Sequence, residues 1–148
     1  MGTKQNPLIG KRIVKVWLAD DKQAMKFDVE GAEPIIAKVD ADCCSFTWIE
    51  SFDAPTALLG VVQAIENLDM PDLGNGKEQT RDKDTEGDVI AYYGCKITTD
   101  KGACVIDYRN DSNGYYGGSI VWPNEGYYYG GVYGQNVSAE RWKEVAHV

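Results

Sequence analysis

The sequence predicts a mainly β protein whose antiparallel strands follow one another as a β-meander, with one short helix at the C-terminal end. Apolar and polar residues alternate along most segments, which is typical of strands with one buried face. Turn-forming residues, such as Asp20-Asp21 and Asp100-Lys101-Gly102, separate the alternating segments. A helical pattern is clear only near the end of the chain. An α+β description is the alternative, because the helix would pack on the sheet.

The alternating segments give the expected strands in chain order. They are residues 11–18, 24–29, 34–39, 45–50, 88–98 and 103–108, followed by strands rich in tyrosine and glycine. Pro55 fits the first position of a single helical turn over residues 55–59. Residues 61–68 remain open between strand and short helix, since periodicity alone does not separate the two.

Length and composition indicate one domain over residues 1–148, with a mass of 16.4 kDa. Within it, Leu8-Ile9-Gly10 resembles Leu58-Leu59-Gly60, and a strand pair follows each copy. Two duplicated β-meander halves would explain this match, and an undivided meander is the alternative. Between the halves, residues 70–87 are expected to form a flexible acidic loop, because so long a segment without periodicity is uncommon inside a compact domain.

The expected helix covers residues 138–147. Ser138 is a good N-cap, and Glu140 would lie near the positive end of the helix dipole. Trp142, Val145 and Ala146 could then share one face and dock on the sheet.

The net charge of -8 excludes a general duplex nucleic-acid binder, because such binding depends on neutralising phosphates with lysine and arginine. Residues 66–88 hold eight acidic and three basic residues, so this segment alone carries -5 of the charge. The sequence also lacks an apolar run long enough for a membrane helix and an apolar leader. We therefore expect a cytoplasmic protein that contacts no membrane.

No metal site, cofactor or catalytic group is expected. The segment from Asp82 to Asp88 imitates the first half of a calcium loop, but Tyr93 occupies the position of the bidentate glutamate. His147 is the single histidine and is near the chain end, so nucleophilic catalysis lacks a base. The four cysteines show no metal-binding spacing and are expected to be reduced and buried. A two-residue turn would place Cys95 and Cys104 on one face, and a three-residue loop on opposite faces.

Tyrosine and glycine dominate residues 113–118 and again residues 125–134. Tyrosine offers a rigid face with a polar tip, and glycine lets a partner approach the backbone, so this mixture is typical of binding surfaces. Strand alternation would bury about half of these tyrosines, since neighbours such as Tyr115 and Tyr116 point to opposite faces. The candidate binding residues are Arg109, Asn113, Tyr115, Tyr116, Trp122, Tyr127 and Tyr129.

Three motifs carry a resemblance to a known family. Leu8-Ile9-Gly10-Lys11, the segment from Asp42 to Glu50 (D-C-C-S-F-T-W-I-E) and the segment from Tyr108 to Gly118 (Y-R-N-D-S-N-G-Y-Y-G-G) resemble a domain-of-unknown-function family seen in bacteriophage genomes. The resemblance covers residues 8–121. It implies a viral origin and the cytoplasm of an infected host cell, and it assigns no catalytic residues.

We therefore expect a small non-catalytic binding protein that engages a host protein, with inhibition of a host-defence system as one version of that role. A sponge for a nucleotide signal is the alternative, with Arg109 and glycine amides holding phosphate. A hydrolase using loop carboxylates is the third hypothesis. A homo-oligomer is also compatible with the sequence, because flat strands near the chain end could leave an open sheet edge.

Overall fold

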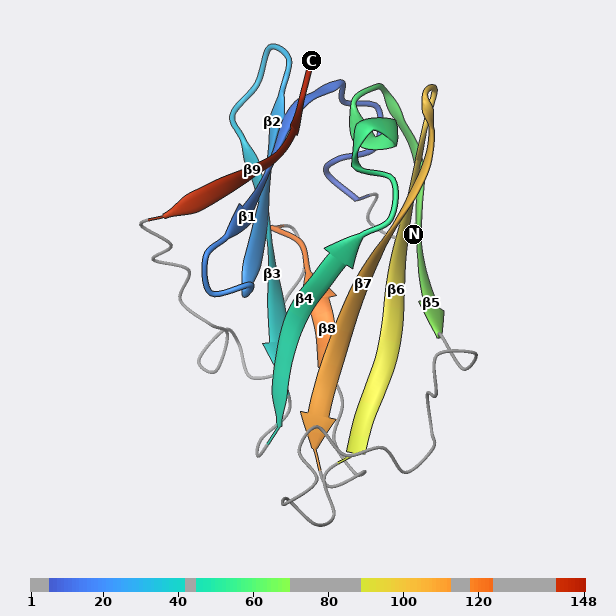
Figure 1. The fold of residues 1–148 in the computed structure, drawn as a ribbon. Helices are drawn as coiled ribbons and strands as arrows, with labels where there is room; N and C mark the ends of the chain where they lie inside the picture. The colour runs from blue at the N-terminus through green and yellow to red at the C-terminus, as the bar shows by residue number, and fades with distance from the viewer. Residues whose placement is uncertain (1–5, 42–44, 70–88, 113–117, 124–140) are drawn as a thin grey trace, which may run out of the picture.

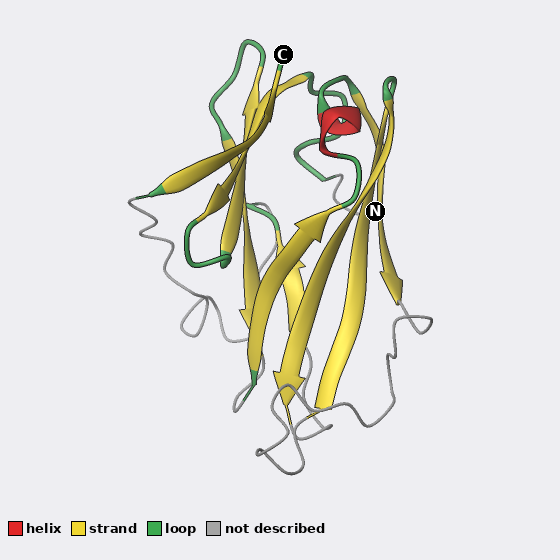
Figure 2. Ribbon diagram, viewed as in Figure 1, coloured by secondary structure: helices red, strands yellow, loops and turns green. Residues whose placement is uncertain are grey.

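The computed structural model describes residues 6–41, 45–69, 89–112, 118–123 and 141–148. In these ranges the chain forms two antiparallel sheets that face each other (Figure 1), as predicted from the alternating pattern. The single helix among the described residues is a short 3-10 turn at Pro55–Leu58, drawn in red in Figure 2. The acidic loop predicted at 70–87 lies outside the described residues.

The first sheet has five strands in the order β8-β3-β2-β1-β9. Its strands are β1 (Ile13–Ala19), β2 (Ala24–Val29), β3 (Ile35–Ala41), β8 (Gly118–Val121) and β9 (Trp142–His147). In β2 the alternation is direct, because Met25, Phe27 and Val29 are buried while Lys26 and Asp28 are partly exposed. One face of this sheet therefore lines the core.

The second sheet has four strands in the order β4-β7-β6-β5. Its strands are β4 (Phe46–Phe52), β5 (Val62–Asp69), β6 (Val89–Thr99) and β7 (Gly102–Ser112). The long hairpin of β6 and β7 turns through Asp100 and Lys101, with Thr99 paired to Gly102. This two-residue turn places Cys95 and Cys104 on the same buried face, and neither forms a disulfide.

The two halves of the chain have matching strand arrangements, which supports the predicted duplication. Strands β1, β2 and β3 pair in sequence, and β5, β6 and β7 repeat the same arrangement. Each half even carries the same irregularity. The register shifts just after Ile13 pairs with Val29, and again just after Val62 pairs with Thr99. These two pairs are therefore structural equivalents.

The fourth strand of each half crosses to the other sheet. Strand β4 leaves the first meander and pairs with β7, whereas β8 leaves the second meander and pairs with β3. The equivalent residues Ile49 and Ile120 are both buried by this exchange. The sequence copies before β1 and β5 also meet, since Gly10 N donates to Val62 O (2.8 Å) and Ile13 N donates to Gly60 O (2.9 Å).

The core fills the space between the inner faces of both sheets. Leu8 and Leu58, the first residues of the two sequence copies, are fully buried in one cluster that also contains Phe27. Trp122 stacks on Phe27 with ring centroids 5.8 Å apart. The two halves thus share one hydrophobic core, in accord with a single folding unit over the described residues.

The predicted C-terminal helix is wrong over its second part, because Trp142–His147 forms strand β9 at the edge of the first sheet. Its residues pair antiparallel with β1, for example Ala146 with Val16 and Trp142 with Ala19. The local signals for a helix are weak compared with a ladder of backbone hydrogen bonds along an edge that would otherwise be open. Residues 138–140 lie outside the described residues.

The structure also answers two local questions, at residues 55–59 and 61–68. The helical turn that Pro55 begins is confirmed as the 3-10 helix at Pro55–Leu58. The ambiguous segment at 61–68 is a strand, β5, because it pairs along its length with β6. Tertiary pairing settles what the short apolar pattern left open.

The close approach of β8 to β4 gives a first prediction. A β-carbon at Gly118 would collide with the hydroxyl of Thr47 and lie 2.9 Å from the carbonyl oxygen of Asp40. We expect Gly118→Ala to lower the free energy of unfolding by about 1–3 kcal/mol, because overpacking displaces neighbouring atoms. Urea denaturation measures the change, with Ser119→Ala at the exposed neighbouring position as the control. Equal stability of the two variants would contradict the close contact.

The buried cysteines give a second prediction, on pH. Burial is the largest cause that raises the pKa of the Cys95 thiol from 9.0 to about 12, and the nearby Cys104 adds to it. The unfolded chain releases this proton above pH 9 while the folded chain keeps it, so stability falls as the pH rises from 9 towards 12. We expect the wild type to lose about 2 kcal/mol more than Cys95→Ala between pH 8.5 and 10.5. Urea denaturation of both proteins at both pH values measures this loss. Equal losses of unfolding free energy in the wild type and in Cys95→Ala would contradict the prediction.

Candidate binding surface

The outer face of the four-stranded sheet carries a row of aromatic and charged side chains. Strand alternation turns Tyr93 and Tyr108 towards the core, where their rings stack at 5.2 Å. The next residue on each strand therefore points outward. On that face Arg109 of β7 pairs directly with Tyr92 of β6 on one side and with Trp48 of β4 on the other.

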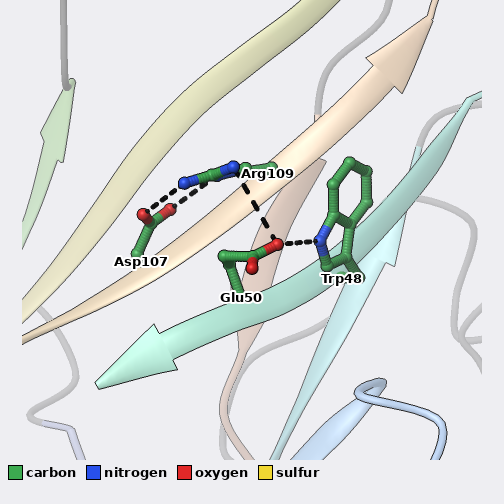
Figure 3. Close-up of polar contacts among 4 residues, drawn as sticks. All are labelled: Trp48, Glu50, Asp107 and Arg109. Atoms are coloured by element: carbon green, nitrogen blue, oxygen red, sulfur yellow. Dashed lines mark hydrogen bonds and ion pairs between the residues drawn. The ribbon is translucent and has the colours of Figure 1, made fainter. Parts of the chain in front are cut away.

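Arg109 is held in place by two carboxylates (Figure 3). Its Nε and a terminal nitrogen donate to the two oxygens of Asp107, at 3.2 and 2.9 Å. Its other terminal nitrogen is 3.9 Å from Glu50 Oε1, and the same oxygen accepts a hydrogen bond from Trp48 Nε1 at 2.9 Å. The guanidinium also lies 4.6 Å from the ring centroid of Tyr92. A two-pronged ion pair and an aromatic face together fix the direction of this side chain.

Aromatic rings extend this row along β4. Phe46 stacks on Trp48 with centroids 6.0 Å apart, and 47% of the Phe46 surface is exposed. Among the described residues, Phe46 and Val148 are the large hydrophobic side chains that remain exposed. We call Phe46, Trp48, Tyr92 and Arg109 the aromatic patch.

The charge balance of the patch is acidic. The hydrogen bonds that Arg109 donates to Asp107 are the main cause that raises the pKa of the Arg109 guanidinium, so the arginine stays charged. Its single positive charge is opposed by Asp107 and Glu50, and the buried residue Asp111 lies two residues farther along β7, opposite Phe46. The patch therefore presents aromatic surface in a setting of excess negative charge.

The predicted binding residues lie in different parts of the structure. Arg109 lies in the aromatic patch, whereas Trp122 is in the core with 5% of its surface exposed. Trp122 is therefore a packing residue in this structure, because the inner face of the first sheet needs a large group beside Phe27. Asn113, Tyr115, Tyr116, Tyr127 and Tyr129 lie outside the described residues.

The candidate residues from the sequence did not include three members of the aromatic patch, Phe46, Trp48 and Tyr92, or the neighbouring carboxylate of Glu50. A signal was present, since Phe46-Thr47-Trp48-Ile49-Glu50 alternates and the buried Thr47 and Ile49 leave the other three on the outer face. The register of β4 on β7 was not readable from the sequence. Only that register places Trp48 opposite Arg109.

The described residues contain no group of three histidine, cysteine or acidic side chains that could hold a metal ion. The segment from Asp82 to Asp88, which imitates part of a calcium loop, lies outside them. His147 is exposed and pairs with Glu144, with Nδ1 to Oε2 at 2.6 Å. No helix in the described part of the chain is long and apolar enough to cross a membrane.

The fold is that of a two-sheet β protein, and the aromatic patch lies on the outer face of its four-stranded sheet. The chain belongs to a family described as a domain of unknown function (DUF7448), whose model matches residues 6–122. That match contains strands β1 to β8 and all four residues of the aromatic patch, and β9 lies beyond it. No curated protein and no solved structure matches the chain.

The contrasting positions of two tryptophans give a third prediction. Trp122→Ala should lower the free energy of unfolding by about 3–5 kcal/mol, because it removes a buried ring from the core. Trp48→Ala should change it by less than about 1 kcal/mol, because the ring lies on the outer face. Urea denaturation of both variants measures the difference. A small effect at Trp122, or a larger one at Trp48, would contradict the assignment of these rings.

Proposed function

We propose that this chain is a non-catalytic binding protein that recognises a partner protein through the aromatic patch. The observation that carries the proposal is the exposed ring of Phe46, stacked on the partly buried Trp48, next to an arginine that is already oriented. Tryptophan, tyrosine and arginine are the residue types that most often dominate binding energy. Stacking and ion pairing restrict these side chains before binding, so little conformational entropy remains to be lost.

The partner that fits this surface is a protein with a basic contact region. The chain carries a net charge of -8, and the patch is bordered by Asp107 and Glu50. Complementary charge increases the rate of association and penalises acidic partners. The resemblance to bacteriophage proteins supports a host protein as the partner, with a component of a defence system as the specific candidate.

A nucleotide sponge has less support from the same geometry. Phosphate binding would require the Arg109 guanidinium, whose donors already serve Asp107 and face Glu50. These two carboxylates would also repel a phosphate group. The aromatic rings could stack a base, so a panel of nucleotides belongs in the test.

The fourth prediction tests the proposal by affinity purification from a host-cell lysate, followed by a binding titration with the purified partner. We expect Phe46→Ala and Trp48→Ala each to weaken binding by about 30-fold or more, as loss of a central aromatic contact does. Trp17→Ala is the matched control, because Trp17 lies on the outer face of the other sheet. Binding should also weaken as the salt concentration rises, since opposite charges steer the association.

Two results would reject the proposal. One is a partner that binds both patch variants as tightly as the wild type, provided that thermal unfolding shows them to be folded. The other is a nucleotide that raises the melting temperature by several degrees while no protein partner binds, which would favour the sponge.

A further inference from the structure

The internal duplication makes β1 and β5 equivalent strands, yet their outer edges differ. Strand β1 pairs with β2 on one side and with β9 on the other. Strand β5 pairs with β6 and is the edge strand of the second sheet among the described residues. The duplicated fold therefore offers the same edge twice, and β9 occupies one of the two.

The pairing of β9 on β1 shows what a strand at this edge does. Val16 lies opposite Ala146 and is fully buried. On the outer face, the ammonium of Lys26 lies 5.0 Å from the ring of Trp17 and 4.9 Å from the ring of Trp142, which joins β9 to its sheet. Lys15 Nζ also pairs with Glu144 Oε1 at 3.2 Å. An added strand covers the core edge and brings charge-matched side chains to the outer face.

At the edge of β5, no strand among the described residues covers the same positions. Counting from the equivalent residues Ile13 and Val62, Ile65 takes the place of Val16, and it is only partly buried although it packs against the core. Four other side chains of β5 are exposed: Gln63, Ala64, Glu66 and Asn67. Unpaired backbone groups along such an edge can accept another strand.

We propose that the outer edge of β5 binds an extended, basic segment of a partner protein as an added antiparallel strand. Backbone hydrogen bonds would supply affinity, as in other cases of strand addition. An apolar side chain of the segment would cover Ile65 and a lysine or arginine would lie beside Glu66, whose contact with Lys96 is long, at 3.8 Å, and exposed. This site is separate from the aromatic patch and stands without it.

Charge decides against two other occupants. Strand β5 contains Glu66 and Asp69 and no lysine or arginine, so two copies pairing through it would bring like charges together, each chain with a net charge of -8. The chain's own β9 is matched to β1 through Trp17 and Lys15, and β5 offers glutamate and alanine at those positions. A basic segment of a different protein avoids both conflicts.

The fifth prediction uses a short capped peptide of alternating lysine and valine as the probe. At about 1 mM peptide, we expect slower amide hydrogen exchange on the β5 amides that point away from β6, with exchange in β9 unchanged. Glu66→Lys should weaken peptide binding about tenfold, because it reverses the charge beside the added strand. Glu33→Lys, at an exposed turn of the other sheet, is the matched control and should bind as the wild type does.

Control measurements separate binding at the β5 edge from binding elsewhere and from dimer formation. A peptide of alternating glutamate and valine should not protect the β5 amides. A lysine peptide bound only at the aromatic patch would leave the exchange of the β5 amides unchanged, so their protection reports binding at the β5 edge. The proposal is overturned if the β5 amides gain no protection, if both peptides bind equally, or if the protein alone is a dimer whose β5 amides are already protected. Light scattering detects that dimer.

Discussion

The exchange of fourth strands between the two halves is the constraint on which the rest of the structure depends. Because β4 joins β7 and β8 joins β3, neither half can complete its sheet from its own residues. The close passage at Gly118, where Thr47 leaves no room for a side chain, belongs to this exchange. The inner faces then enclose one core, in which Leu8 and Leu58 are equivalent. Cooperative folding of the described residues follows, since each half stabilises the other.

The same exchange creates the aromatic patch. Strand β4 comes from the first half and carries Trp48, whereas β7 comes from the second half and carries Arg109. The patch thus exists only when the halves are joined, and Asp107 and Tyr92 then fix the arginine between them. These contacts restrain the side chains of the patch, which would reduce the entropy lost in the proposed binding of a partner.

The duplication gives the two halves the same strand arrangement, but the side chains on their equivalent edge strands, β1 and β5, differ. One edge strand is covered by β9, which lies beyond the matched family region, and its equivalent, β5, carries Glu66 on an exposed edge. The backbone thus offers two equal edges that differ in chemistry. Side-chain charge, rather than backbone geometry, therefore distinguishes the two edges.

The mainly β class and the buried, free state of Cys95 and Cys104 could be predicted from the sequence, because alternation and turn residues are local signals. The short match between Leu8 and Leu58 left both a duplicated and an undivided meander open, and the strand pairing supports the duplication. The sequence pattern misjudged residues 142–147 as a helix and Trp122 as a surface group. The strand at 142–147, the burial of Trp122 and the pairing of Trp48 with Arg109 became visible only in the folded chain. The physical reason is that strand register and edge pairing depend on contacts between distant segments, and one short segment fits a helix or a strand until its neighbour is present.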